Sequence, residues 1–155
     1  MDEAILTSAL RILERRDHAL GELRQKMKRK YPQQPDDVEA ILSYLQETGV
    51  IDDARFAREF VHYLQSTNPK GRLRLRQELQ KKGIESEVIQ ATLAELDDDE
   101  TELARQLAER KAASFPAGLE RQKQQERLYR FLVSRGFDFG TARTVAQQAL
   151  SATDT

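Results

Sequence analysis

Lysine and arginine gather in three segments of this chain, and clustered cations of this kind attract phosphates and carboxylates. Each segment carries five basic residues against one or two acidic ones, so its local charge is +3 or +4. The basic residues are Arg24, Lys26, Lys28, Arg29 and Lys30; Arg72, Arg74, Arg76, Lys81 and Lys82; and Arg121, Lys123, Arg127, Arg130 and Arg135. Because the whole chain has a formal charge of −1, the clusters indicate local anion binding rather than a general coat for nucleic acid.

Residues suited to catalysis are few. His18 and His62 are the only histidines, and they lack the spacing of a zinc site on one helix. The seven glycines are scattered and form no phosphate-binding loop. The acidic run at 97–102 lacks the glycine and the twelve-position pattern of a calcium loop, and is typical of a solvated helix start. We therefore expect no enzyme activity, no metal site and no cofactor.

Two further features bear on the compartment. The chain has no cysteine, so it forms neither a disulfide nor a thiolate zinc site. Asp2 and Glu3 stand where a secretory signal peptide would carry positive charge, and no apolar run reaches the length of a membrane span. These features predict a cytoplasmic protein.

A repeated phrase indicates how the basic segments are positioned. The phrase at Leu75, Leu79, Gly83 and Ile84 recurs 53 residues later at Leu128, Leu132, Gly136 and Phe137. A fainter copy, Leu23 and Met27, lies 52 residues upstream, with Tyr31 in place of the glycine. An internal repeat of this length is typical of stacked helical units. Glycine after a leucine stripe predicts a left-handed residue at the end of a helix, at both Gly83 and Gly136.

Apolar residues at three- and four-residue steps predict nine helices. The expected segments are 3–16, 17–31, a stripe at 38–45 that stops at Gly49, 52–67, 72–82, 86–96, 97–113, and two segments divided at Gly136. Asp17, Asp52 and Ser86 are the expected N-caps, and Ile51 with Phe56 has the spacing of a hydrophobic staple. The break at 68–71 is the clearest internal boundary.

The nine segments fall into three groups, because the first helix type repeats as well. Leu103, Ala104 and Leu107 follow Phe56, Ala57 and Phe60 at a constant offset of 47 residues. We predict an all-α fold, an elongated tandem array of three three-helix repeats at 1–49, 50–97 and 98–150, with a frayed tail at 151–155.

The phrase Gly49-Val50-Ile51-Asp52-Asp53-Ala54-Arg55-Phe56-Ala57, with the joints around Gly83 and Gly136, resembles the signature of the RecX family. The resemblance covers nearly the whole chain, and the structural signature it assigns is Gly49, Ile51, Asp52, Asp53, Phe56, Gly83 and Gly136. The first unit departs from the pattern, because Lys30, Tyr31 and Pro32 replace the Lys-Gly turn and two glutamines lengthen the loop.

The resemblance implies three tandem three-helix repeats and a function without chemistry. RecX-like proteins regulate the RecA recombinase by binding in the groove of its filament on single-stranded DNA. For this chain the resemblance implies a monomer that inhibits ATP hydrolysis and strand exchange and limits filament growth, in recombination, DNA repair and the SOS response. Single-stranded DNA would be contacted directly or through the filament.

The expected filament contacts are basic residues on the equivalent helices of the three repeats. Arg72 and Arg76 favour an anionic partner, because like charges four apart on a helix cost a few tenths of a kcal/mol without one. Arg74 can instead pair with Glu78. The full set is Lys70, Arg72, Arg74 and Arg76 in the central repeat, with Lys26, Arg29, Arg127 and Arg130 on the outer repeats.

Three other interpretations stay open at the level of sequence. The basic and acidic helices could neutralise each other within the fold. Each repeat could act as an autonomous helix-turn-helix, for which Gln77 and Gln80 offer base readout beside the arginines. The chain could also be a generic helical adaptor for a protein partner.

Overall fold

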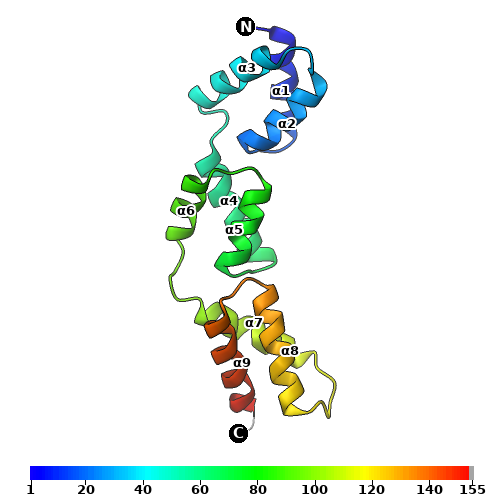
Figure 1. Ribbon diagram of the computed structural model, residues 1–155, viewed down its shortest axis with the longest axis vertical. Coiled ribbons are helices and arrows are strands. Elements are labelled where there is room, and N and C mark those ends of the chain that lie inside the picture. The colour runs from blue at the N-terminus through cyan, green and yellow to red at the C-terminus, as the bar shows by residue number, and fades with distance from the viewer. Residues whose placement is uncertain (154–155) are drawn as a thin grey trace. The chain divides into compact units, whose positions relative to one another are not determined.

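The amphipathic segments form nine α-helices and no strand within the described residues of the computed structural model, whose backbone is described for residues 1–153 and whose side chains are described through residue 150 (Figure 1). The helices are α1 (Glu3–Arg15), α2 (Leu20–Lys30), α3 (Pro35–Glu47), α4 (Asp53–Thr67), α5 (Arg72–Lys81), α6 (Ser86–Ala94), α7 (Thr101–Ala113), α8 (Arg121–Ser134) and α9 (Phe139–Thr153). The all-α prediction with three helices to a repeat is confirmed. None of these helices has the length and apolar character needed to cross a membrane in the described part of the chain.

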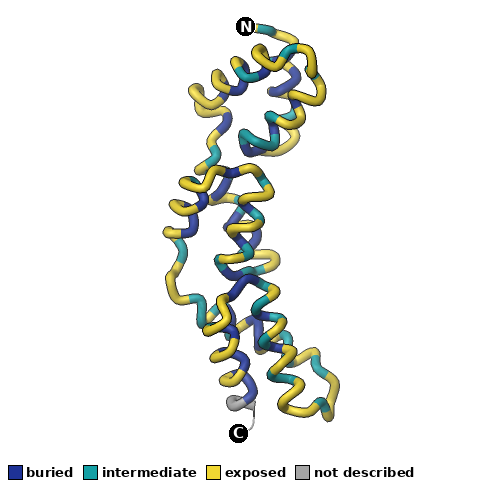
Figure 2. Tube along the Cα trace, viewed as in Figure 1, coloured by how far each residue is buried: buried dark blue, intermediate teal, exposed yellow. Residues whose placement is uncertain are grey.

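The leucine stripes face the core of each repeat. Leu23, Leu75 and Leu128 are fully buried, and so are the residues one turn later, Met27, Leu79 and Leu132. Figure 2 shows buried positions alternating with exposed ones along the helices, as an amphipathic period requires. Residues 53 positions apart in the repeated phrase therefore occupy equivalent core positions.

Glycine ends two equivalent helices in the left-handed conformation, as predicted. Gly83 has φ 77° and Gly136 has φ 95°. After each glycine the next N–H bonds back to the buried leucine of the stripe, Ile84 to Leu79 at 3.2 Å and Phe137 to Leu132 at 3.1 Å. This backward bond is the Schellman closure of a helix C-terminus. In the first repeat Tyr31 ends α2 at φ −125° instead, so that joint is built differently.

Several predicted helix starts move by one to four residues. Asp17 does not cap α2, which begins at Leu20 after Ala19. Ser86 is the first residue of α6, whose first helical bond runs from Ile89 N–H to the Glu85 carbonyl, so Ser86 lies inside the helix. The segment expected to begin with the acidic run at residue 97 begins four residues later, as α7, at Thr101. Short polar residues mark such boundaries approximately, because neighbouring repeats supply some of the caps.

The Asp52 cap is confirmed, since its carboxylate accepts the Arg55 N–H at 3.1 Å. Ile51, which precedes it, is buried at 2% exposure, while its staple contact with Phe56 stays a prediction. The frayed tail at 151–155 stays a prediction: α9 extends to Thr153, and residues 154–155 lie outside the described residues.

The chain divides into two compact units that do not coincide with the repeats. One contains residues 1–60 with 78–92, and the other contains 61–77 with the chain from 93 onward. The core of the first unit gathers α1, α2 and α3 around Leu23, Ile41 and Leu45. The second unit contains a core formed by α7, α8 and α9 around Leu128, Leu132 and Phe137. The dividing lines pass through α4, α5 and α6, so the start of α4, the end of α5 and most of α6 group with the first repeat.

Candidate nucleic-acid interface

The eight predicted contact residues differ in solvent exposure. Five are exposed and three, all at the start of the central basic helix, are partly buried. The exposed ones are Lys26, Arg29, Arg76, Arg127 and Arg130; the partly buried ones are Lys70, Arg72 and Arg74.

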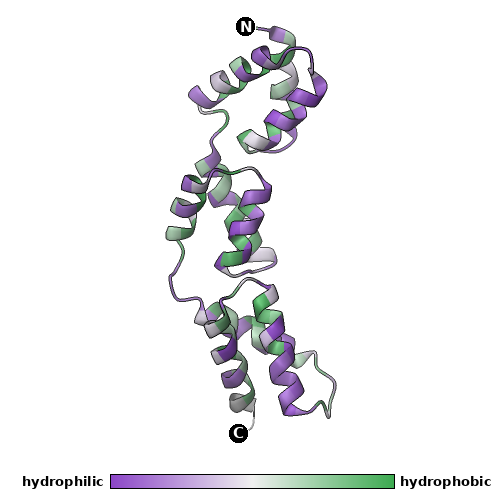
Figure 3. Cartoon of the chain, viewed as in Figure 1, coloured by the Kyte–Doolittle hydropathy of each residue, from purple (hydrophilic) through white to green (hydrophobic). Residues whose placement is uncertain are grey.

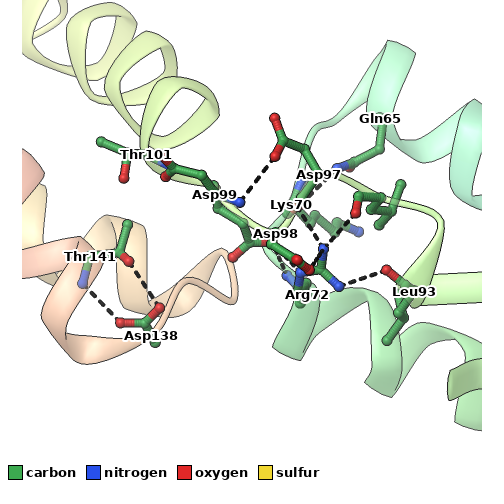
Figure 4. Close-up of polar contacts among 12 residues, drawn as sticks. Gln65, Lys70, Arg72, Leu93, Asp97, Asp98, Asp99, Thr101, Asp138 and Thr141 are labelled. Carbon is green, nitrogen blue, oxygen red and sulfur yellow. Dashed lines mark hydrogen bonds and ion pairs between the residues drawn. The ribbon is translucent and has the colours of Figure 1, made fainter.

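Arg72 is committed to partners within the fold (Figure 4). Its guanidinium donates to the carbonyls of Leu93 at 2.6 Å, Leu96 at 2.9 Å and Asp97 at 2.6 Å. These carbonyls end α6 and begin the following linker, where a helix leaves acceptors without intrahelical partners. The interpretation of Arg72 as a filament contact is therefore revised, because its charge already caps α6. The expected repulsion between Arg72 and Arg76 is therefore no longer a reason to expect an external anion at Arg72.

The Arg72 main chain is held as well. Its N–H donates to the Glu100 carboxylate at 2.7 Å, and the Asp98 carboxylate lies 3.5 Å from the guanidinium. Burial raises the pKa of Glu100, against the opposing effect of the Arg72 N–H and charge. The acidic run predicted a solvated helix start. Glu100 does stand at the N-cap position of α7, but its carboxylate is partly buried and caps α5.

The same arrangement occurs one repeat earlier, with Asp53 in the place of Glu100. The Leu20 N–H, at the start of α2, donates to the Asp53 carboxylate at 2.8 Å. Leu20 and Arg72 are 52 residues apart, as are the buried leucines of their helices, while Asp53 and Glu100 are 47 apart, as are the matching positions of α4 and α7. Burial raises the pKa of Asp53 too, against the Leu20 hydrogen bond. The signature residue Asp53 therefore caps the basic helix of the preceding repeat.

The glycine joints dock at the same places. Within the first unit, the main chain of Gly83 lies so close to Gly21 that a Cβ on Gly83 would come within 3.3 Å of the Gly21 Cα. Within the second unit, a Cβ on Gly136 would overlap the main chain of Arg74. The carbonyls of Arg135 and Gly136 accept from the N–H groups of Gly71 at 2.7 Å and Leu73 at 3.2 Å. The start of α5 is therefore satisfied by backbone from the next repeat.

The third basic helix, α8, begins at a different position from the other two. The position equivalent to Leu20 and Arg72 is Gln125, and α8 begins four residues before it, at Arg121. The first bond of α8 runs from the Gln124 N–H to the Glu120 carbonyl at 2.9 Å. Because α8 begins one turn earlier than the equivalent helices, Gln125 lies inside the helix rather than at its N-terminus. The N-terminal part of α8 is hydrophilic throughout (Figure 3).

Two other residues of the central set have structural contacts of their own. The Lys70 main chain is bracketed by the Gln65 side chain, whose amide donates to the Lys70 carbonyl at 3.0 Å and accepts its N–H at 2.9 Å. Arg74 lies against Gly136 through its backbone. Arg76 is exposed, and its side chain has no hydrogen bond or ion pair within the described residues. Arg76 is the member of the central set best placed to contact an external anion.

In the first repeat, Lys26 contacts the buried histidine His18, which was not among the predicted site residues. The Lys26 Nζ lies 2.6 Å from the Nε2 of His18, and the His18 Nδ1 lies 3.0 Å from the Arg16 carbonyl. An ammonium only donates, so Nε2 accepts and Nδ1 carries the proton. Burial, with the charges of Arg16 and Lys26, lowers the pKa of His18 against the opposing Arg16 carbonyl bond. Arg29 is exposed and unpaired among the described residues.

The third repeat joins two of the predicted cations in a groove of about 520 Å³, which we call the α7–α8 groove. Its lining is Lys111, Ser114, Phe115, Pro116, Arg127, Arg130, Phe131 and Ser134. The Lys111 Nζ and the Arg135 guanidinium lie 5.4 and 5.1 Å from the centre of the Phe131 ring. Lys111, Phe115 and Phe131 were not among the predicted site residues, although positions 127, 130, 131 and 134 have the spacing of a single helix face.

Comparison with known proteins gives a consistent result. Residues 52–93 match the family model described as RecX, second three-helix domain, and residues 97–145 match RecX, third three-helix domain. The chain is 34% identical to "Regulatory protein RecX" of Chlorobaculum tepidum over 97% of this chain and 93% of the relative. It is 37% identical to the protein of that name from Cronobacter sakazakii, over 86% and 84% of the two chains.

Solved structures show the same fold. "Crystal structure of RecX from Lactobacillus salivarius" superposes with a TM-score of 0.84 over 95% of both chains, at 23% identity. "Crystal structure of regulatory protein RecX" gives 0.75, covering 94% of this chain and 71% of the other, at 24% identity.

Proposed function

Since the chain belongs to the RecX family of regulatory proteins, we propose that it modulates the RecA recombinase, mainly as an inhibitor. It binds as a monomer in the groove of the RecA filament on single-stranded DNA, in the cytoplasm, and limits ATP hydrolysis, strand exchange and filament growth. The observation that carries the proposal is the match to curated regulatory proteins over nearly the whole chain.

The described surface is suited to binding rather than to catalysis. Arg29, Arg76, Arg127 and Arg130 are exposed cations on the basic helices and have no carboxylate partner in the described part of the chain. Exposed cations on the basic helices of the three repeats meet the phosphates or acidic surface of a partner at several points. Inhibition then needs only a difference in affinity between filament states.

The test is the rate of ATP hydrolysis by RecA on single-stranded DNA, measured as the protein is added. The wild-type chain should lower the rate. The variant Arg76→Glu, Arg127→Glu, Arg130→Glu should inhibit less while keeping its helical content. Arg11→Glu, Arg58→Glu is a control on exposed, unpaired arginines outside the basic helices. A wild-type chain that leaves hydrolysis unchanged would contradict the proposed function.

A second candidate function is direct duplex recognition by a helix-turn-helix. Arg76, Gln77 and Gln80 are all exposed on α5, and glutamine and arginine are residues that read base edges. Equal affinity for naked duplex and for the RecA filament would favour this function. Binding to free RecA without DNA would favour a generic adaptor.

A further inference from the structure

We infer that the α7–α8 groove binds single-stranded nucleic acid directly, holding the backbone with Arg127 and Arg130 and a base against Phe115. This inference rests on the proposed function and names the place where the chain itself meets the strand. The groove is formed by the end of α7, the linker to α8 and one face of α8.

The charges of the groove call for an anion. Its lining contains three cations and no carboxylate. Arg127 and Arg130 are three apart on α8, and neither has a hydrogen bond or an ion pair through its side chain among the described residues. Like charges at this spacing repel each other unless an anion lies between them. A phosphodiester backbone supplies such an anion at every nucleotide.

The apolar surfaces indicate that the anion carries a planar ring. Phe115 and Pro116 come from the linker, and Phe131 from α8, so aromatic groups and cations are interleaved around one groove. Proteins that bind single strands without sequence preference combine these two kinds of side chain, because every base has a face that stacks. Phe131 is already flanked by Lys111 and Arg135, which leaves Phe115 as the stacking residue.

The two serines distinguish a nucleotide from an acidic peptide side chain. The Ser114 hydroxyl donates to the Lys111 carbonyl, and the Ser134 hydroxyl to the Phe131 carbonyl, each at 2.6 Å. Their protons are therefore engaged, so that towards a ligand each hydroxyl can act only as an acceptor. A base offers N–H groups to such acceptors, whereas a carboxylate only accepts and gains nothing from them.

The experiment uses the full chain, without recombinase, and a fluorescent mixed-sequence oligonucleotide whose anisotropy is followed over a salt series. Arg127→Ala, Arg130→Ala should reduce the salt slope by about 1.4, since each phosphate contact on a single strand contributes about 0.7. Phe115→Leu keeps an apolar side chain but removes the stacking face. It should lower affinity by about 5- to 150-fold, the equivalent of about 1–3 kcal/mol per stacked base, with the salt slope unchanged.

The control is Arg110→Ala, Lys123→Ala, which removes two exposed cations of the same repeat that do not line the groove. Slopes and affinities equal to this control in both groove variants would overturn the inference. So would tighter binding of an oligoglutamate peptide than of the oligonucleotide, or equal binding of a blunt duplex, whose paired bases cannot stack on Phe115. Because recombinase is absent, any of these outcomes leaves the ATP-hydrolysis test of the proposed function intact.

Discussion

The carboxylate of Asp53 accepts the main-chain N–H of Leu20 at 2.8 Å, across 33 residues of sequence. Glu100 repeats the relationship with Arg72 at 2.7 Å. An acidic residue at the start of one repeat thus caps the basic helix of the repeat before it. This contact gives a physical reason for one of the two aspartates in the family signature, since the other, Asp52, caps its own helix.

We expect Asp53→Ala to lower the free energy of unfolding by about 1–2 kcal/mol, because the Leu20 N–H loses its cap. Asp53→Asn keeps an acceptor oxygen and should cost less. Urea unfolding at neutral pH measures both. Equal losses for the two variants would show that the hydrogen bond does not stabilise the fold.

Asp53 also predicts a dependence on pH. Burial raises the pKa of Asp53 in the folded state above the ordinary value of 3.8. At a pH between the ordinary pKa and the raised pKa, the folded state therefore binds more protons than the unfolded state. The contribution of Asp53 to stability is therefore largest at acid pH and declines as the pH rises through its raised pKa. Between neutral pH and pH 4, the wild type should gain stability relative to Asp53→Asn. A constant difference across the series would contradict the raised pKa.

His18 should act in the opposite direction. Its lowered pKa means that the unfolded state takes up protons first, so the stability it contributes is present above its ordinary pKa of 6.5 and declines as the pH falls below that value. The loss below pH 6.5 should be smaller in His18→Gln. Thermal unfolding of both proteins from pH 7.5 to pH 5.5 measures the effect, and parallel curves would count against it.

Arg72→Ala should destabilise the fold by about 1–3 kcal/mol, because three carbonyls lose a charged donor. Arg76→Ala is the matched control, one turn along the same helix, and should change stability by less than about 0.5 kcal/mol. Thermal unfolding distinguishes the two. Equal melting temperatures for both variants would return Arg72 to the set of free surface cations.

The cost in stability of substituting a glycine should depend on the surroundings of that glycine. Gly49 has φ 78° but open space around it, Gly83 has φ 77° beside Gly21, and Gly136 has φ 95° against Arg74. Alanine at Gly49 should cost about 1 kcal/mol from backbone strain alone, valine at Gly83 about 1–2 kcal/mol, and alanine at Gly136 more than alanine at Gly49. Denaturant midpoints give the order, and similar costs at Gly49 and Gly136 would exclude the close approach.

Much of the fold could be predicted because local signals repeat. The buried leucines and the glycine joints recur at a fixed interval, so period and burial agree at Leu75 and Leu128. The caps were harder, because Leu20 and Arg72 receive theirs from residues far along the chain. No local pattern around Asp17 contains that information.

The candidate site divides in the same way. Sequence identified the basic helices, and Arg76, Arg127 and Arg130 are exposed on them. It could not separate Arg72 from Arg76, since a guanidinium that caps a distant helix looks the same in sequence as a free one. Nor could it place Lys111 and Phe115 beside Arg127, because that groove depends on the path of the linker between α7 and α8.

The caps at Asp53 and Glu100 imply that the sequence segment that repeats and the segment that folds as a unit have different boundaries. A fragment that ends at residue 49 would contain α1, α2 and α3, yet it would lack Asp53, whose carboxylate accepts the N–H of Leu20 at the start of α2. Repeats of this type cooperate with their nearest neighbours, so loss of one should lower the cooperativity of the one before it.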